Sequence, residues 1–137
     1  MTLDEIKRHL QEHFSDGLLI IVGSGLSCTE GLPGMGELAE HLKKTIGEGL
    51  SSTDKALWTE ILPFFATKGL EGALLEKPPT ITLDAAISTA TGTFIALHER
   101  QVISDVFTTG RKLRLTRLLS HLLKPSSGLP IVTTNYD

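Results

Sequence analysis

The sequence predicts an α/β fold, a partial Rossmann-like parallel sheet with a large helical insertion between its first two strands. Three features of the chain carry this prediction. Residues 18–22 (Leu-Leu-Ile-Ile-Val) are an unbroken apolar run, which is typical of a strand buried on both faces of a parallel sheet. Residues 131–134 (Ile-Val-Thr-Thr) are mostly β-branched, which favours a second strand. Between them, residues 37–123 have mainly helical patterns of apolar residues.

The elements ahead of the insertion follow from local signals. Apolar residues recur on one helical face over residues 3–14, after Thr2 and Glu5 at the spacing of a capping box. The strand at 18–22 comes next, and a glycine loop over residues 23–36 follows it. The sequence therefore predicts a helix, a strand and a glycine loop in this order, with a new helix after the loop.

Helical stretches are expected within the insertion around residues 57–61 and 70–75, and then over 83–106 and 115–122. A loop at 124–130 leads into the second strand. Two strands are too few for a stable parallel sheet, because such sheets are normally several strands wide and covered on both faces. We therefore expect the chain to be the N-terminal part of a domain that continues beyond residue 137.

The composition is that of a folded protein and excludes several classes of function. The 137 residues suit one domain, and the fractions of hydrophobic (40%) and charged (21%) residues are those of globular proteins. A net charge of −3 without a long run of Lys or Arg disfavours direct nucleic-acid binding. Cys28 is the only cysteine, so the chain can form neither an internal disulfide nor a paired-cysteine zinc site. With no signal peptide and no apolar stretch near the roughly 20 residues of a membrane span, we expect a cytoplasmic protein without membrane contact.

The turn after the first strand, Gly23-Ser24-Gly25, has the character of a phosphate-binding loop. Glycine lets the backbone approach a phosphate closely, and the N-terminus of a following helix attracts anions. The pattern lacks the third glycine of the usual dinucleotide fingerprint and the Gly-Lys-Ser/Thr of a P-loop. Taken alone, the turn is equally well explained as a simple reversal of the chain.

A second polar cluster, Asn135 and Asp137, follows the second strand. Ligands of open parallel sheets bind beyond the carboxyl ends of the strands. If the two strands are neighbours, this cluster and the glycine turn face one crevice, where the amide and carboxylate can bind ligand hydroxyls or amides. The alternative is that both residues cap a helix or close a turn.

Together, the two segments resemble the two NAD-binding signatures of the sirtuin-like superfamily. Residues 23–33, Gly-Ser-Gly-Leu-Ser-Cys-Thr-Glu-Gly-Leu-Pro, are similar to the family's Gly-Ala-Gly-x-Ser-x-x-x-Gly-Ile-Pro loop. Residues 133–137, Thr-Thr-Asn-Tyr-Asp, are similar to its Thr-Gln-Asn-hydrophobic-Asp motif. The second form resembles the bacterial branch found in antiphage-defence proteins more than it resembles protein deacetylases. The resemblance covers the first half of such a domain.

The resemblance implies a role for each matching position. Asn135 would be the catalytic residue near the nicotinamide ribose, and Asp137 would bind the nicotinamide carboxamide. The segment from Gly23 to Ser27 would hold the diphosphate and the adjoining ribose of NAD+, which is the substrate, and no metal is implied. The cofactor-binding set is therefore Gly23, Ser24, Gly25, Ser27, Gly31, Pro33, Thr133, Thr134 and Asp137.

The activity that the resemblance implies for the full-length protein is hydrolysis of NAD+ to ADP-ribose and nicotinamide by an antiphage-defence effector. Such an effector is expected to act as a homo-oligomer or with a regulatory partner. An NAD-dependent protein deacylase and a non-catalytic NAD or ADP-ribose sensor are the alternatives. The family's catalytic histidine follows the Asn-containing motif, so we expect the 137-residue chain alone to be inactive.

The remaining candidate residues have ordinary explanations. The five histidines all fall in predicted helices and are expected at the surface or the edge of the core; they are His9, His13, His41, His98 and His121. The only basic cluster is expected to be a solvated helix face, with contact to an acidic partner or to a cofactor phosphate left open. It consists of Arg111, Lys112, Arg114 and Arg117.

Overall fold

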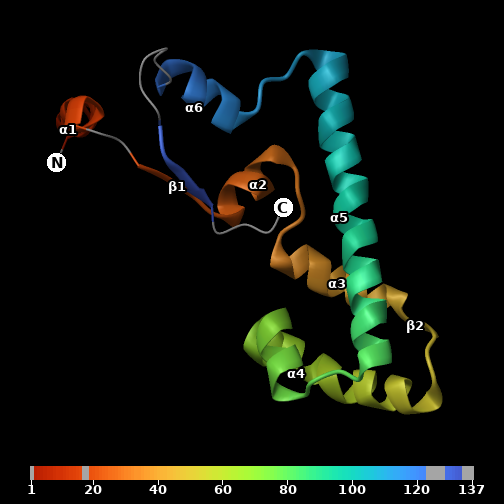
Figure 1. Cartoon of the computed structure of the whole chain (residues 1–137). Helices are drawn as coiled ribbons and strands as arrows, with labels where there is room; N and C mark the ends of the chain where they lie inside the picture. The colour runs from red at the N-terminus through yellow and green to blue at the C-terminus, as the bar shows by residue number, and fades with distance from the viewer. Residues whose placement is uncertain (1, 17–18, 123–128, 134–137) are drawn as a thin grey trace. The chain divides into compact units, whose positions relative to one another are not determined.

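The computed structural model describes residues 2–16, 19–122 and 129–133. The chain divides into two compact units (Figure 1). The first, which we call the strand unit, consists of Met1–Glu30 and Arg111–Asp137. The second, the helical unit, is the intervening segment Gly31–Gly110. Each unit is described by itself below.

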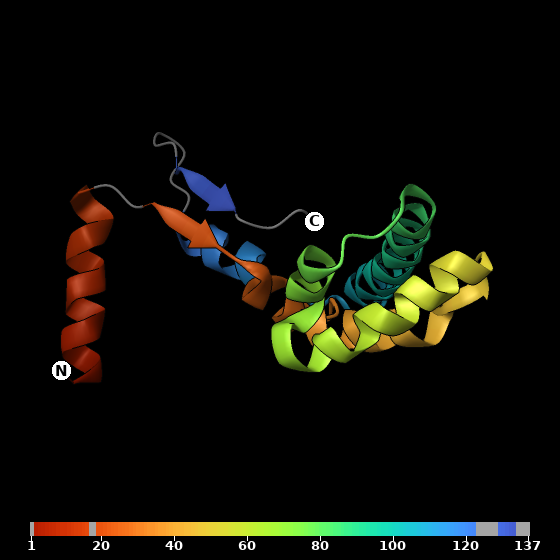
Figure 2. The same cartoon turned by 90° about the horizontal axis from the view of Figure 1, so that it is seen from below.

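The strand unit is built around a pair of parallel strands. Its elements in chain order are α1 (Leu3–Asp16), β1 (Ile20–Val22), α2 (Ser24–Glu30), α6 (Arg114–Leu122) and β3 (Ile131–Thr133). The two strands lie side by side in Figure 2, and their register pairs Ile20 with Ile131 and Val22 with Thr133. Helices α2 and α6 contact each other beside them.

The helical unit packs three helices around one hydrophobic core. Its elements are α3 (Met35–Thr45), β2 (Ile46–Gly49), α4 (Ser52–Glu76) and α5 (Ile81–Thr109), and each of the three helices contacts the other two. Two glycines interrupt or end its helices. Helix α4 bends at Gly69 (φ 71°), and α5 ends at Gly110, which has the left-handed conformation. The core cluster consists of Leu38, Leu42, Ile46, Trp58, Ile61, Phe65, Leu70, Ala73, Leu83 and Ile87.

A buried carboxylate ties the start of α4 to the start of α5. Ser51 and Thr80 are the N-cap residues of these helices, and their hydroxyls accept hydrogen bonds from the N–H groups of Asp54 and Leu83. Both hydroxyls also donate to the carboxylate of Asp54, at 2.8 Å from Ser51 and 2.5 Å from Thr80. These bonds, with that from Thr80 the stronger influence, hold the pKa of Asp54 below its ordinary value of 3.8 although burial opposes them.

The predicted Rossmann-like α/β fold is wrong. The described residues are mostly helical, and they contain only two short parallel strands. The apolar run expected as a strand at 18–22 forms a described strand of three residues, and much of the expected glycine loop at 23–36 is helical, as α2 and the start of α3. The apolar faces of α3, α4 and α5 pack on one another around a core of their own. What remains of the prediction is the parallel pairing of the two strands.

No helix within the described ranges combines the length and the apolar character that a membrane crossing needs.

Candidate functional site

The glycine turn lies between β1 and α2. The carbonyl of Gly23 accepts a hydrogen bond from the N–H of Leu26 at 2.9 Å, and Ser24 and Gly25 are the first two residues of α2. Ser24 and Gly25 are exposed, while Ser27 on the next part of the helix is half-buried. The predicted diphosphate-binding segment is thus a strand-to-helix turn whose first residues are open to solvent.

The strand register brings the second predicted segment to the same end of the strand pair. Val22 is paired with Thr133, so the last described residues of β1 and β3 lie at the common carboxyl end of the pair. Thr133 itself is exposed. Thr134, the predicted catalytic Asn135 and Asp137 lie outside the described residues. The structure therefore brings Gly23 and Thr133 to one edge, as two neighbouring parallel strands require.

The last two predicted cofactor residues, Gly31 and Pro33, belong to the helical unit. Gly31 has a φ of 111°, a backbone conformation that residues with a side chain rarely adopt. A Cβ on it would lie 3.2 Å from Cγ2 of Val102. Pro33 is half-buried in the segment between α2 and α3. The backbone conformation and the contact with Val102 are sufficient to explain the glycine at position 31.

A cavity of about 610 Å³ lies in the strand unit beside the glycine turn. Its volume is within the range of small-molecule sites. Its wall contains no Asp or Glu side chain among the described residues, and Arg114 is its single charged residue. The lining residues are Ile20, Ile21, Val22, Gly23, Gly25, Leu26, Thr29, Arg114, Leu115 and Leu118.

An ion pair joins the end of α2 to the start of α6 beside this cavity. The carboxylate of Glu30 is 3.0 Å from the Arg111 guanidinium, and it also accepts a hydrogen bond from the backbone N–H of Arg114. The Glu30 carbonyl accepts a second bond from Arg111. Only 12% of the Glu30 side chain is exposed. The sequence gives no local signal for this cluster, because Glu30 and Arg111 are 81 residues apart.

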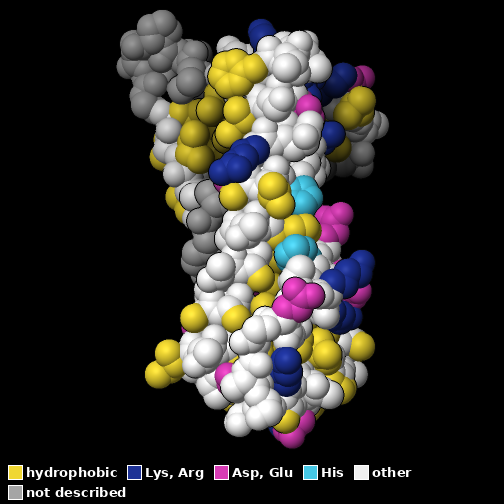
Figure 3. All heavy atoms as spheres, turned by 90° about the vertical axis from the view of Figure 1, so that its right-hand side faces the viewer, with side chains coloured by type: hydrophobic (Ala, Val, Ile, Leu, Met, Phe, Trp, Pro, Cys, Tyr) yellow, Lys and Arg dark blue, Asp and Glu magenta, His cyan; other side chains and the backbone are white. Residues whose placement is uncertain are grey.

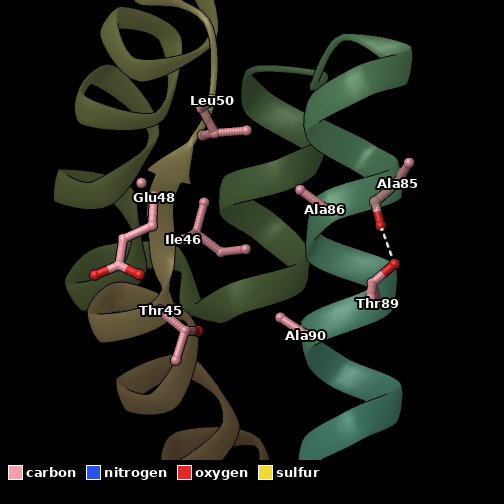
Figure 4. Close-up of a pocket in the computed structure, with 9 residues that line it drawn as sticks. Thr45, Ile46, Glu48, Leu50, Ala85, Ala86, Thr89 and Ala90 are labelled. Atoms are coloured by element: carbon pink, nitrogen blue, oxygen red, sulfur yellow. Dashed lines mark hydrogen bonds between the residues drawn. The ribbon is translucent and has the colours of Figure 1, made fainter.

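A second cavity, of about 420 Å³, lies in the helical unit between β2 and α5 (Figure 4). Its α5 side consists of small residues, Ala85, Ala86, Thr89 and Ala90. The Thr89 hydroxyl donates to the Ala85 carbonyl at 2.8 Å, and Figure 4 shows the Glu48 carboxylate on the side of β2 away from α5. Convergent polar groups mark most ligand sites, so the cavity of the strand unit is the stronger candidate.

The described histidines of the helical unit are packing residues. His41 stacks on Phe94 with ring centroids 4.1 Å apart, and His98 meets the edge of the same ring at 4.5 Å. Histidine side chains reach the surface on the face drawn in Figure 3, where the hydrophobic side chains are scattered. No three His, Cys, Asp or Glu side chains of the described ranges come together as a metal site.

Comparison with protein-family models, curated proteins and solved structures gave no match to this chain.

Proposed function

We propose that this chain contributes part of an NAD+-binding site and that the protein hydrolyses NAD+ to ADP-ribose and nicotinamide as an antiphage-defence effector. The observation that carries the proposal is the parallel pairing of β1 with β3. It brings Gly23 and Thr133 to a common edge, although more than 100 residues separate them in the sequence. A ligand that spans both segments is therefore geometrically reasonable.

The surroundings of Gly25 also support a ligand at the turn. Its φ is not positive, and a Cβ added to it would meet no other atom within 4 Å. Neither the backbone nor the packing of the described residues requires glycine there, although glycine within a helix costs up to about 1 kcal/mol relative to alanine. Open backbone beside a cavity suits a ligand that approaches the main chain closely.

In the proposed reaction, the bond between nicotinamide and ribose breaks through an oxocarbenium-like state, and water takes the place of the leaving group at the sugar carbon. The amide of Asn135 would orient the ribose and the water, and Asp137 would hold the nicotinamide carboxamide. Both tasks are positioning tasks, which depend on geometry more than on a strong nucleophile.

NAD+ consumption by the native protein that contains this sequence tests the proposal. Removing one positioned polar group from an active site lowers a rate by about 100-fold or more, and we expect this of Asn135→Ala. Gln101→Ala is the matched control, because it removes an exposed amide from α5, where Gln101 bonds only to Asp105. Its rate should equal that of the wild-type protein.

Three other outcomes would change the proposal. An unchanged rate in Asn135→Ala would remove this residue from the mechanism. Binding of ADP-ribose without any consumption of NAD+ would identify a nucleotide-binding module instead of an enzyme. A protein that neither consumes NAD+ nor binds ADP-ribose would contradict the proposal altogether.

A further inference from the structure

We propose that Arg114 is the residue that binds a phosphate of the nucleotide held in the cavity of the strand unit. The inference rests on the proposed function, and it adds to it a ligand-binding residue outside both of the sequence segments that suggested NAD+. Arg114 is the first residue of α6 and lines the same cavity as Gly23 and Gly25.

The charge balance around the cavity leaves Arg114 uncompensated. Glu30 and the guanidinium of Arg111 form an ion pair at 3.0 Å. Glu30 contacts Arg114 through its backbone N–H. No carboxylate of the described residues forms an ion pair with the Arg114 guanidinium, and the residue is exposed. Among the described residues, the charge of Arg114 therefore has no carboxylate paired with it.

The rest of the cavity wall fits a ligand with one apolar part and one anionic part. The side chains of Ile20, Leu26, Leu115 and Leu118 offer an apolar surface, and Thr29 adds a hydroxyl. Gly25 leaves open space beside them. A guanidinium binds a phosphate through charge-assisted, often bidentate hydrogen bonds. A nucleotide has this combination, because its base is flat and largely apolar and its phosphates are anionic.

Because Glu30 contacts the backbone of Arg114, the side chain of Arg114 can be replaced without removing this contact. Because Glu30 accepts from the main-chain N–H of residue 114, a change of side chain there leaves this hydrogen bond in place. Arg114→Gln removes the charge and keeps a polar side chain of similar length. Arg117→Gln is the matched control, since Arg117 lies on the same helix and is exposed but does not line the cavity.

The experiment measures the dissociation constants of ADP-ribose and of adenosine for the wild-type protein and both variants, in one buffer of fixed ionic strength. We expect Arg114→Gln to weaken ADP-ribose binding by about tenfold or more, the effect of one charge-assisted contact. Adenosine has no phosphate, so its affinity should not change. Arg117→Gln should bind both compounds like the wild-type protein, and Arg114→Lys should recover part of the lost affinity.

The outcomes separate this inference from the proposed function. If wild-type protein binds ADP-ribose and Arg114→Gln binds it equally well, the role of Arg114 is wrong and the proposed function stands. If both glutamine variants lose the same affinity, the effect is one of overall charge and the inference is overturned. An equal loss for adenosine would also overturn it. If the wild-type protein binds neither compound, the proposed function and the inference fail together.

Discussion

The two units of this protein bury their apolar side chains to very different extents. In the helical unit, α3, α4 and α5 enclose a common core, and Leu42, Ile61 and Leu83 are completely buried. Among the described side chains of the strand unit, Ile20 is the one buried hydrophobic residue, and Ile21 on the same strand is 67% exposed. The strand unit contains the cavity beside the glycine turn and most of the candidate ligand residues. If the proposed function is correct, the packed core and the ligand site belong to different parts of the chain, as is common where a packed scaffold accompanies functional loops.

The largest effect that this comparison predicts is the difference between two isoleucine truncations. Ile61→Ala removes a fully buried side chain from the core of the helical unit and should lower the free energy of unfolding by about 2–5 kcal/mol. Ile21→Ala removes an exposed one from β1 and should change it by no more than about 0.5 kcal/mol. Urea denaturation followed by far-ultraviolet circular dichroism measures both. Equal losses in the two variants would mean that β1 is buried in the native protein and would break the comparison.

A smaller effect is expected where the helical unit joins α4 to α5. Thr80→Ala removes the N-cap hydroxyl of α5 and should destabilise the protein by about 1 kcal/mol near neutral pH. The same change removes the main cause of the lowered pKa of Asp54. In the wild-type protein the contribution of Asp54 is complete above its ordinary pKa of 3.8 and is lost as the pH falls through the lowered value.

The pH dependence of that variant is the sharper measurement. With the pKa of Asp54 closer to its ordinary value, Thr80→Ala has less stability to lose in acid than the wild-type protein. The difference in free energy of unfolding between the two should therefore shrink as the pH falls below 3.8. Stability curves that stay parallel through this range would show that Asp54 does not depend on Thr80.

Local signals in the sequence predicted most of the helices and the two paired strands but not α2 or β2. Non-local contacts account for most of what the sequence did not predict. The capping-box pair at the N-terminus is present, since Thr2 and Glu5 exchange both hydrogen bonds. Pro63 lies inside α4, and this helix continues through it and bends at Gly69. A proline can lie inside a helix when one face of the helix packs on a core. A glycine with a positive φ, in contrast, departs from the helical backbone and bends the helix.

The candidate site shows the same division between local and non-local information. The first strand and the glycine turn are contiguous in the sequence, so it could be predicted that they lie next to each other. The pairing of this strand with residues 131–133 followed from the hypothesis of two neighbouring parallel strands. The cluster of Glu30, Arg111 and Arg114 could not be predicted, because its members come from opposite sides of an 80-residue segment, Gly31–Gly110. The sequence analysis placed Arg114 in a basic cluster expected to be a solvated helix face, with contact to a cofactor phosphate as an alternative, and did not single it out from Arg111, Lys112 and Arg117.

Gly25→Ala should cost no stability, and it sharpens the comparison most directly. The new Cβ would lie in open space on a helix, so the variant should be as stable as the wild-type protein or more stable by up to about 1 kcal/mol. The same Cβ would occupy part of the cavity that Gly25 lines. We therefore expect ADP-ribose to bind about tenfold more weakly, as measured by calorimetric titration alongside urea denaturation.

Gly92→Ala is the matched control for this substitution. Gly92 is an exposed helical glycine of α5, and a Cβ on it would also meet nothing within 4 Å. It belongs to the helical unit and does not line the cavity of the strand unit. Its replacement should raise stability by a similar or larger amount and leave ADP-ribose affinity unchanged. If Gly25→Ala also leaves the affinity unchanged, the open backbone of the turn does not contact the ligand, and the separation of ligand chemistry from the packed core loses its main support.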